Sequence, residues 1–91
     1  MYNRYYTKQF QKSFNKILSS GKAKRVDVEY VVDILCRGEK LPSIYRSHKL
    51  HGEYSEYNGC HVKGDLILIY TIKKEQLVLV LIDLGSHSEL Y

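Results

Sequence analysis

The apolar residues of this chain repeat with two different periods, one in each half of its 91 residues. Before residue 40 they recur every three or four positions, which places them on one face of a helix. From Gly52 onward they form short alternating or continuous runs separated by charged turns, as strands do. This order of elements predicts an α+β fold, in which the helices lie on one side of a mainly antiparallel sheet of three or more strands.

The first half of the chain predicts a short strand followed by a helical hairpin. Residues 2–6 are rich in tyrosine and precede Thr7, a residue type that often caps a helix. The apolar faces of the two helices are Phe10, Phe14, Ile17 and Leu18 in the first, and Val28, Val31, Val32 and Leu35 in the second. Gly21 and Gly38 are expected to end the helices, because glycine readily adopts the left-handed conformation that closes a helix.

The second half predicts three strands after a connecting loop. Residues 39–46, which include the only proline, are expected to lead from the second helix to the sheet. Strands are predicted at 54–63, 66–72 and 77–84. The last two are expected to form a hairpin, because the charged residues 73–76 lie between them.

The composition predicts a single folded domain over residues 1–91. Hydrophobic residues make up 44% of the chain, which is enough apolar surface to offset the chain entropy lost on folding. No apolar run approaches the roughly 20 residues that span a bilayer, and the N-terminus lacks the apolar run of a signal peptide. We therefore expect a cytoplasmic protein that has no contact with a membrane.

An excess of basic residues indicates a polyanionic partner. Fourteen Lys and Arg against ten Asp and Glu give a net charge of +4. Positive charge attracts nucleic acid, although many enzymes share this bias. The basic side chains concentrate in the helical hairpin, at Lys8, Lys12, Lys16, Lys22, Lys24 and Arg25. A lysine row on a helix is more often a solvated face than a binding surface, so charge alone does not assign a function.

The cysteines and histidines do not match the spacing of a metal site. Cys36 and Cys60 show no C-x-x-C spacing and are expected to be reduced. Cys60 and His61 are neighbours on a predicted strand, so their side chains must point to opposite faces. If Cys60 faces the core, His61 and Lys63 share the outer face. The sequence also contains no serine nucleophile elbow, P-loop or dinucleotide fingerprint.

Three blocks of the second half resemble a known family. They read S-H-K-L-H-G-E-Y at 47–54, C-H-V-K-G-D and an apolar run ending in tyrosine at 60–70, and L-G-S-H-S-E-L-Y at 84–91. Their order and spacing, together with the chain length, resemble the YafQ branch of the RelE/ParE toxin superfamily. The resemblance extends over the whole chain and is most specific over residues 46–91.

The resemblance implies the toxin of a type II toxin–antitoxin pair, an endoribonuclease that cleaves mRNA in the ribosomal A site. In such metal-independent cleavage the ribose 2′-OH attacks the adjacent phosphorus and leaves a 2′,3′-cyclic phosphate. The implied partners are the ribosome, mRNA and a cognate antitoxin in a heterotetramer, with no metal and no small-molecule cofactor. The basic helical hairpin is a candidate docking surface for an acidic antitoxin segment.

The resemblance also implies an active-site set. The catalytic candidates are His48, His61, Asp65 and His87, and the candidates for binding the phosphate or the base are Arg46, Lys49, Lys63 and Tyr91. His87 is the candidate general acid, since imidazole titrates near neutral pH. His48 and Asp65 are candidates for the base or for orienting it, and His61 for contacting the phosphate or the nucleobase. His51 falls at a variable family position and is expected to have no chemical role.

Three positions depart from the family pattern. Tyr54 replaces a tryptophan, and Leu66 stands where some members have a tryptophan, which removes a possible stacking surface. Asn58 stands where arginine is common. We therefore expect weaker phosphate binding unless Arg46 or Lys63 compensates for the missing charge.

Two other functions stay open from the sequence. A ParE-like relative would act on DNA gyrase through protein contacts, and such relatives lack the histidines. A basic RNA-binding or ribosome-binding module without catalysis would depend on its lysines instead. The histidines together with Asp65 favour the ribonuclease.

Overall fold

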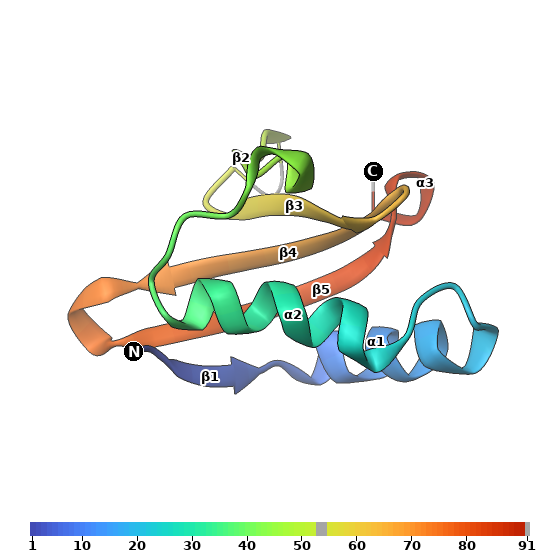
Figure 1. Cartoon of the computed structure of the whole chain (residues 1–91), viewed down its shortest axis with the longest axis horizontal. Helices are drawn as coiled ribbons and strands as arrows, with labels where there is room; N and C mark the ends of the chain where they lie inside the picture. Colours follow the sequence, from blue (N-terminus) through green and yellow to red (C-terminus); the bar gives the residue numbers. More distant parts are fainter. Residues whose placement is uncertain (53–54, 91) are drawn as a thin grey trace.

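The computed structural model describes residues 1–52 and 55–90. Its elements follow one another in the order β1 (Asn3–Tyr6), α1 (Lys8–Ser20), α2 (Arg25–Cys36), β2 (His48–Lys49), β3 (Asn58–Lys63), β4 (Leu66–Lys73), β5 (Val78–Ser86) and α3 (His87–Leu90) (Figure 1). Short 3-10 turns, η1 (Ser43–Tyr45) and η3 (Lys74–Gln76), lie in two of the connections. Within the described ranges, no helix has the length and apolarity that crossing a membrane requires.

The strands form one five-stranded sheet in the order β1-β5-β4-β3-β2. β1 runs parallel to β5, while the other neighbouring pairs are antiparallel. Figure 1 shows α1 and α2 together on one side of the sheet, in the lower part of the view, with β2 and α3 in the upper part. The predicted α+β fold, with a first strand, two helices and a mainly antiparallel sheet, is confirmed.

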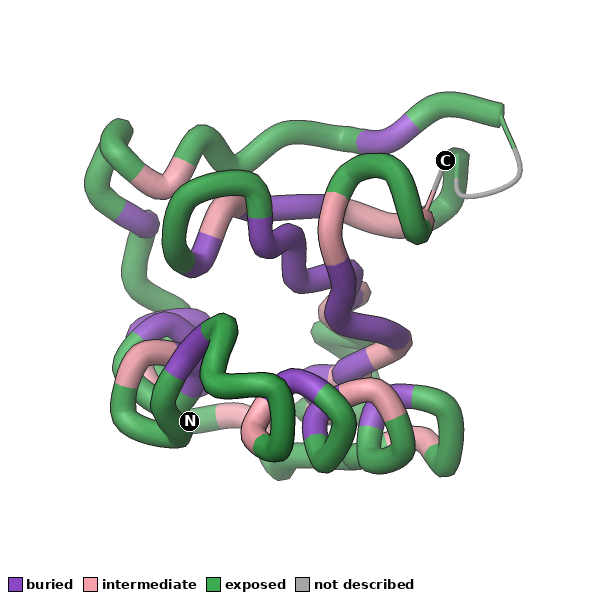
Figure 2. Tube along the Cα trace, turned by 90° about the vertical axis from the view of Figure 1, so that its right-hand side faces the viewer, coloured by how far each residue is buried: buried purple, intermediate pink, exposed green. Residues whose placement is uncertain are grey.

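Alternate residues of β4 pack on the two faces of the sheet. Leu66, Leu68 and Tyr70 belong to a large apolar cluster between the sheet and the helices, which we call the helix-side core. Ile67 and Ile69 belong with Leu50 to a smaller cluster on the opposite face, which we call the outer-face core. In Figure 2 the buried positions gather along the central strands and on the inner side of the helical layer. The apolar faces predicted for the two helices lie in or against the helix-side core.

The helix ends form where the sequence predicts them. Thr7 caps α1, because its hydroxyl oxygen accepts the backbone N–H of Phe10 at 3.0 Å. Gly21 and Gly38 both have a φ of 74°, the left-handed conformation that follows α1 and α2. Beyond Gly38, the N–H of Glu39 donates to the carbonyl of Ile34 at 3.2 Å and completes a Schellman closure.

Several boundaries differ from the prediction. β3 begins at Asn58 rather than at 54, after a turn, and Tyr54 lies outside the described residues. The sequence does not predict β2, because two residues are too few for an alternating pattern to be recognised. β5 continues past 84 to Ser86, because its pairing with β4 extends to Leu66. The four-residue α3 is too short to show a helical period.

Candidate active site

All four histidines of the chain line one open cavity of about 560 Å³. His48 comes from β2, His51 from the segment after it, His61 from β3 and His87 from the start of α3. Leu50 and Ile67 complete the lining and belong to the outer-face core. This histidine cavity therefore lies on the face of the sheet that α1 and α2 do not cover.

The strand register explains why residues so distant in sequence meet. His61 on β3 stands opposite Ile67 on β4, and Ile67 stands opposite Gly85 on β5. His87 follows Gly85 by two residues, so it begins α3 beside this row. His48 pairs with Gly59, which precedes His61 by two residues and shares its face.

Gly59 lets β2 lie close against β3. A Cβ atom built on Gly59 would approach Leu50 Cδ2 to 2.8 Å, a distance that real Cβ atoms do not tolerate. Leu50 itself is buried at 3% exposure beneath the histidine cavity. The absence of a side chain at 59 therefore allows Leu50 to pack and holds His48 next to the sheet.

Backbone carbonyls fix the ring orientation of two histidines. His48 Nδ1 lies 2.8 Å from the carbonyl oxygen of Arg46, and His61 Nδ1 lies 3.2 Å from that of Gly64. A carbonyl can only accept, so each Nδ1 donates, and each neutral ring keeps its lone pair on Nε2. The ring centroids are 6.5 Å apart. Both Nε2 atoms can consequently take part in proton transfer with a third group.

Arg46 acts on the site through its backbone. Its φ of 48° is unusual for a residue other than glycine and aims its carbonyl at His48. Its side chain lines a different cavity, of about 460 Å³, together with Tyr70 and the segment after α2. Lys49 follows His48 on β2, so its side chain points to the opposite face. Neither basic side chain lines the histidine cavity.

The prediction that His61 and Lys63 share a face is wrong. The β3–β4 register shifts between these two residues, so β3 carries a bulge there. As a result Lys63 turns toward α2, where its ammonium group lies 3.6 Å from the Asp27 carboxylate. It lines a separate cavity there with Val62.

Asp65 lies in the turn between β3 and β4, next to the Gly64 carbonyl that holds His61. Its side chain is exposed, does not line the histidine cavity and has no hydrogen-bond or ion-pair partner in the part of the chain that the structure describes. Tyr91, the predicted contact to the base, lies outside the described residues. His51, expected from the sequence to have no role, does line the cavity.

The thiols do not contribute a nucleophile to this site. Cys60 is fully buried in the helix-side core, and burial raises the pKa of its thiol to about 12. Cys36 is also buried, and its thiol donates to the carbonyl of Tyr2 at 2.8 Å. Across residues 1–52 and 55–90, no group of three His, Cys, Asp or Glu side chains is arranged to hold a metal ion. Imidazole is thus the reactive group that the cavity offers.

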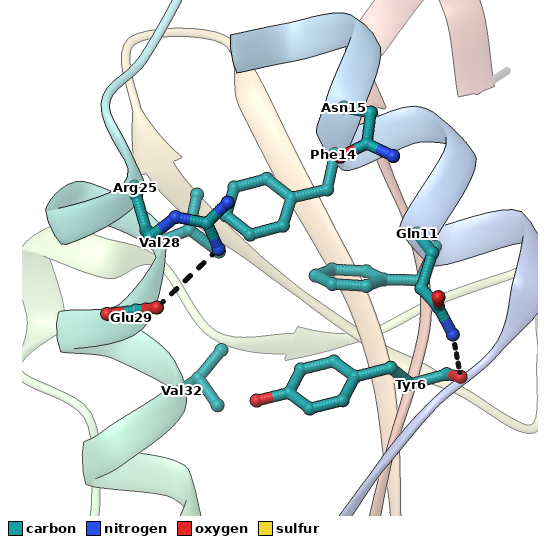
Figure 3. A pocket seen from close by; sticks show the side chains of 9 residues that line it. Tyr6, Gln11, Phe14, Asn15, Arg25, Val28, Glu29 and Val32 are labelled. Carbon is teal, nitrogen blue, oxygen red and sulfur yellow. Dashed lines mark hydrogen bonds and ion pairs between the residues drawn. The ribbon is translucent and has the colours of Figure 1, made fainter.

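Another cavity, the helix groove, lies between α1 and α2 and has a volume of about 380 Å³ (Figure 3). Phe10, Phe14, Val28 and Val32 form its apolar lining. Arg25 lies at its rim, with its guanidinium carbon 5.0 Å from the centre of the Phe14 ring. The groove contains no histidine. Its apolar floor and charged rim are typical of a protein-docking surface rather than of a catalytic site.

In amino-acid sequence, the chain is similar to one family of bacterial toxins. A family model described as "Bacterial toxin of type II toxin-antitoxin system, YafQ" matches residues 2–91. The chain is 34% identical over 67 residues to the putative toxin YafQ of Haemophilus influenzae, an alignment that covers 71% of this chain and 66% of that protein. It is 31% identical over 65 residues to the mRNA interferase toxin YafQ of Escherichia coli, which covers 70% of this chain and 68% of that protein.

Solved structures show the same similarity over the full length. A metal-bound toxin from Helicobacter pylori superposes with a TM-score of 0.89 at 37% identity, and the match covers 100% of both chains. The E. coli DinJ–YafQ complex matches with a TM-score of 0.84 at 26% identity, over 100% of this chain and 99% of that one. Because the family model extends over all but the first residue, this chain belongs to the YafQ family of bacterial toxins of type II toxin–antitoxin systems.

Proposed function

We propose that this protein is a ribosome-dependent endoribonuclease that cleaves mRNA in the A site with histidines as acid and base. The observation that carries the proposal is the convergence of four imidazoles from three elements and one loop on a single open cavity. The E. coli relative named an mRNA interferase supports the substrate class. Imidazole suits both proton transfers, because it exchanges protons near neutral pH.

The reaction is a transesterification within the RNA strand. A base removes the proton of the ribose 2′-OH, and the oxygen forms a bond to the adjacent phosphorus. The bond from phosphorus to the 5′-oxygen then breaks, and an acid protonates that oxygen as it leaves. The products are a 2′,3′-cyclic phosphate and a 5′-hydroxyl, with no net consumption of water or of protons.

The geometry supports a division of roles among the histidines. His48 is the proposed base, because its Nδ1–H is held by the Arg46 carbonyl and its Nε2 is left to accept a proton. His87, at the start of α3, is the proposed acid. His61, fixed by Gly64, is proposed to donate to a phosphoryl oxygen when protonated. Asp65, in the adjacent turn, contributes negative charge near His61 rather than a direct contact in the cavity.

The residues proposed to bind RNA also have different roles. Arg46 and Lys49 are exposed near β2 and are proposed to contact the RNA backbone beyond the scissile phosphate. Lys63 would have to leave Asp27 to bind RNA. Tyr91 is proposed to lie against a base of the message.

Cleavage on programmed ribosomes tests the function directly. Purified protein is added to ribosomes stalled with an empty A site, and the 5′ ends of the message are mapped by primer extension. Cuts within the A-site codon are expected, and they should disappear without ribosomes. An uncut message, with DNA gyrase inhibited instead, would support the gyrase-directed alternative and overturn the proposal.

We also propose that an antitoxin occupies the helix groove. The E. coli relative forms a toxin–antitoxin complex with DinJ. In this chain the groove offers an apolar floor for a helix or strand, and its rim carries Arg25, whose guanidinium group lies 3.8 Å from the Glu29 carboxylate. The fitting partner is an acidic segment with apolar anchors, in a heterotetramer whose antitoxin chains dimerise.

A charge reversal tests that docking surface. Arg25→Glu is expected to weaken antitoxin binding by at least about tenfold, because the substituted carboxylate repels an acidic segment. Arg37→Glu is the matched control, since Arg37 is an exposed arginine that follows the same helix and does not line the groove. Isothermal titration with the protein encoded beside this chain measures both. Equal weakening by the two variants would contradict the assignment.

A further inference from the structure

The residue proposed as the general acid lies on an element too short to hold itself. α3 consists of four residues, His87–Leu90, and an isolated helix of one turn is unstable in water. His87 is exposed at the first position of this turn. Its place at the histidine cavity therefore depends on what fastens α3 to the rest of the molecule.

Glu89 closes α3 in a reciprocal capping box with Ser86. The backbone N–H of Ser86 donates to Glu89 Oε1 at 2.9 Å, and the Ser86 hydroxyl donates to the same oxygen at 2.8 Å. In return the N–H of Glu89 donates to the Ser86 hydroxyl oxygen at 3.3 Å. Ser86 and Glu89 thus enclose His87 between the two halves of one hydrogen-bonded unit.

The same carboxylate connects α3 to the helical hairpin. Lys22 Nζ, in the loop after α1, lies 3.7 Å from Glu89 Oε1, and Lys16 Nζ on α1 lies 3.8 Å from Glu89 Oε2. The Ser86 hydrogen bonds and these lysines lower the pKa of Glu89 to about 2, so the side chain is a carboxylate at neutral pH. On the other side of α3, Leu90 packs against the outer-face core.

We propose that Glu89 is a positioning residue for His87, which holds α3 so that the imidazole faces the histidine cavity. The catalytic part of this inference rests on the proposed ribonuclease function. Glu89 does not line that cavity and does not touch the reacting atoms. Its effect is therefore on where His87 lies, and it contributes little to global stability, because exposed ion pairs on a terminal turn are weak.

Two substitutions separate the hydrogen bonds from the charge. Glu89→Ala removes both the capping box and the ion pairs. Glu89→Gln keeps an Oε1 atom that accepts from Ser86 but loses the charge that faces Lys16 and Lys22. Glu75→Ala is the control, because Glu75 is an exposed glutamate in η3 that does not line the histidine cavity.

The kinetic readout is the rate of mRNA cleavage on programmed ribosomes. Glu89→Ala is expected to lower kcat by about tenfold to a hundredfold, because a small displacement of an acid is costly, while KM stays unchanged. Its Tm is expected to fall by less than about 2 °C. Glu89→Gln should recover most of kcat, and Glu75→Ala should match the parent protein. A normal kcat in Glu89→Ala would overturn the proposal, whereas a Gln variant as slow as the Ala variant would assign the positioning to the ion pairs with Lys16 and Lys22 rather than to the capping box.

A second readout does not depend on nuclease activity. In NMR spectra of the free protein, Glu89→Ala is expected to shift the ring resonances of His87 and leave those of His48 and His61 in place. If the parent protein cleaves no RNA but this selective shift occurs, the positioning role stands and the proposed function fails. Unchanged His87 resonances would refute the positioning role whatever the activity.

Discussion

The two faces of the sheet differ in how much apolar surface they bury and in whether they carry histidines. Among residues 1–52 and 55–90, the helix-side core contains most of the buried apolar residues, while the outer-face core has three, Leu50, Ile67 and Ile69. All four histidines lie on the outer face. Because one face supplies most of the packing, the other can leave polar rings exposed to solvent. We therefore expect substitutions of the histidines to affect cleavage without affecting stability, even where neighbouring residues of one strand belong to different faces.

The largest effect is expected from His48→Ala. Removing the proposed base should lower mRNA cleavage by about a hundredfold to ten-thousandfold, as loss of a general base does. Tm should stay near that of the parent, since His48 is exposed and belongs to neither core. Cleavage kinetics and thermal unfolding measure the two quantities side by side. A large fall in Tm would break the separation between the two faces.

Two adjacent residues of β4 test whether the two faces of the sheet act independently. Leu68→Ala and Ile67→Ala should each lower the free energy of unfolding by about 2–5 kcal/mol, because both side chains are buried. Only Ile67 lines the histidine cavity. Denaturant titration should therefore show two destabilised variants, whereas the rate per folded molecule should fall for Ile67→Ala alone. Equal loss of rate in both would show that the faces are coupled.

Gly59→Val is expected to lower stability and to displace His48, with a smaller effect than the substitutions above. The new side chain would displace Leu50, which lies where a Cβ would be, and with it β2 and His48. Overpacking of this kind costs about 1–3 kcal/mol, which denaturant titration detects. The NMR ring resonances of His48 should shift as well. An unaffected His48 resonance would mean that β2 is held by something other than Leu50.

No effect is expected from a chelator. The proposed reaction uses imidazoles alone, so EDTA should leave the cleavage rate within experimental error of the untreated protein. Ribosomes need magnesium, so the comparison uses free magnesium restored to its initial level after chelation of trace transition metals. A rate that falls with chelation and returns with added zinc or copper would require a metal in the mechanism.

The fold and the site residues were predictable from the sequence to different degrees. The apolar periods reveal α1, α2, β4 and β5, because each is long enough for a repeat to show. The blocks around His48, His61 and His87 single out these residues. Their convergence is a property of strand register, which links His61, Ile67 and Gly85 across three strands and has no local signature.

The errors have identifiable physical causes. Strict alternation places Lys63 beside His61, but the bulge in β3 turns it toward Asp27. β2 is too short to be recognised by pattern. α3 does have a local signal in the sequence, since Ser86 and Glu89 form the S-x-x-E pattern of a capping box.

The role of His87 in cleavage is tested by the chemistry of the cut ends. Parent protein and His87→Ala, matched for folded concentration, are added to programmed ribosomes, and the ends of the cleaved message are analysed chemically. The parent should produce cuts in the A-site codon with a 2′,3′-cyclic phosphate on one fragment and a 5′-hydroxyl on the other, and His87→Ala should produce almost none. Equal cleavage by the two proteins, or a 5′-phosphate at the cut, would contradict a histidine-catalysed mechanism on the outer face.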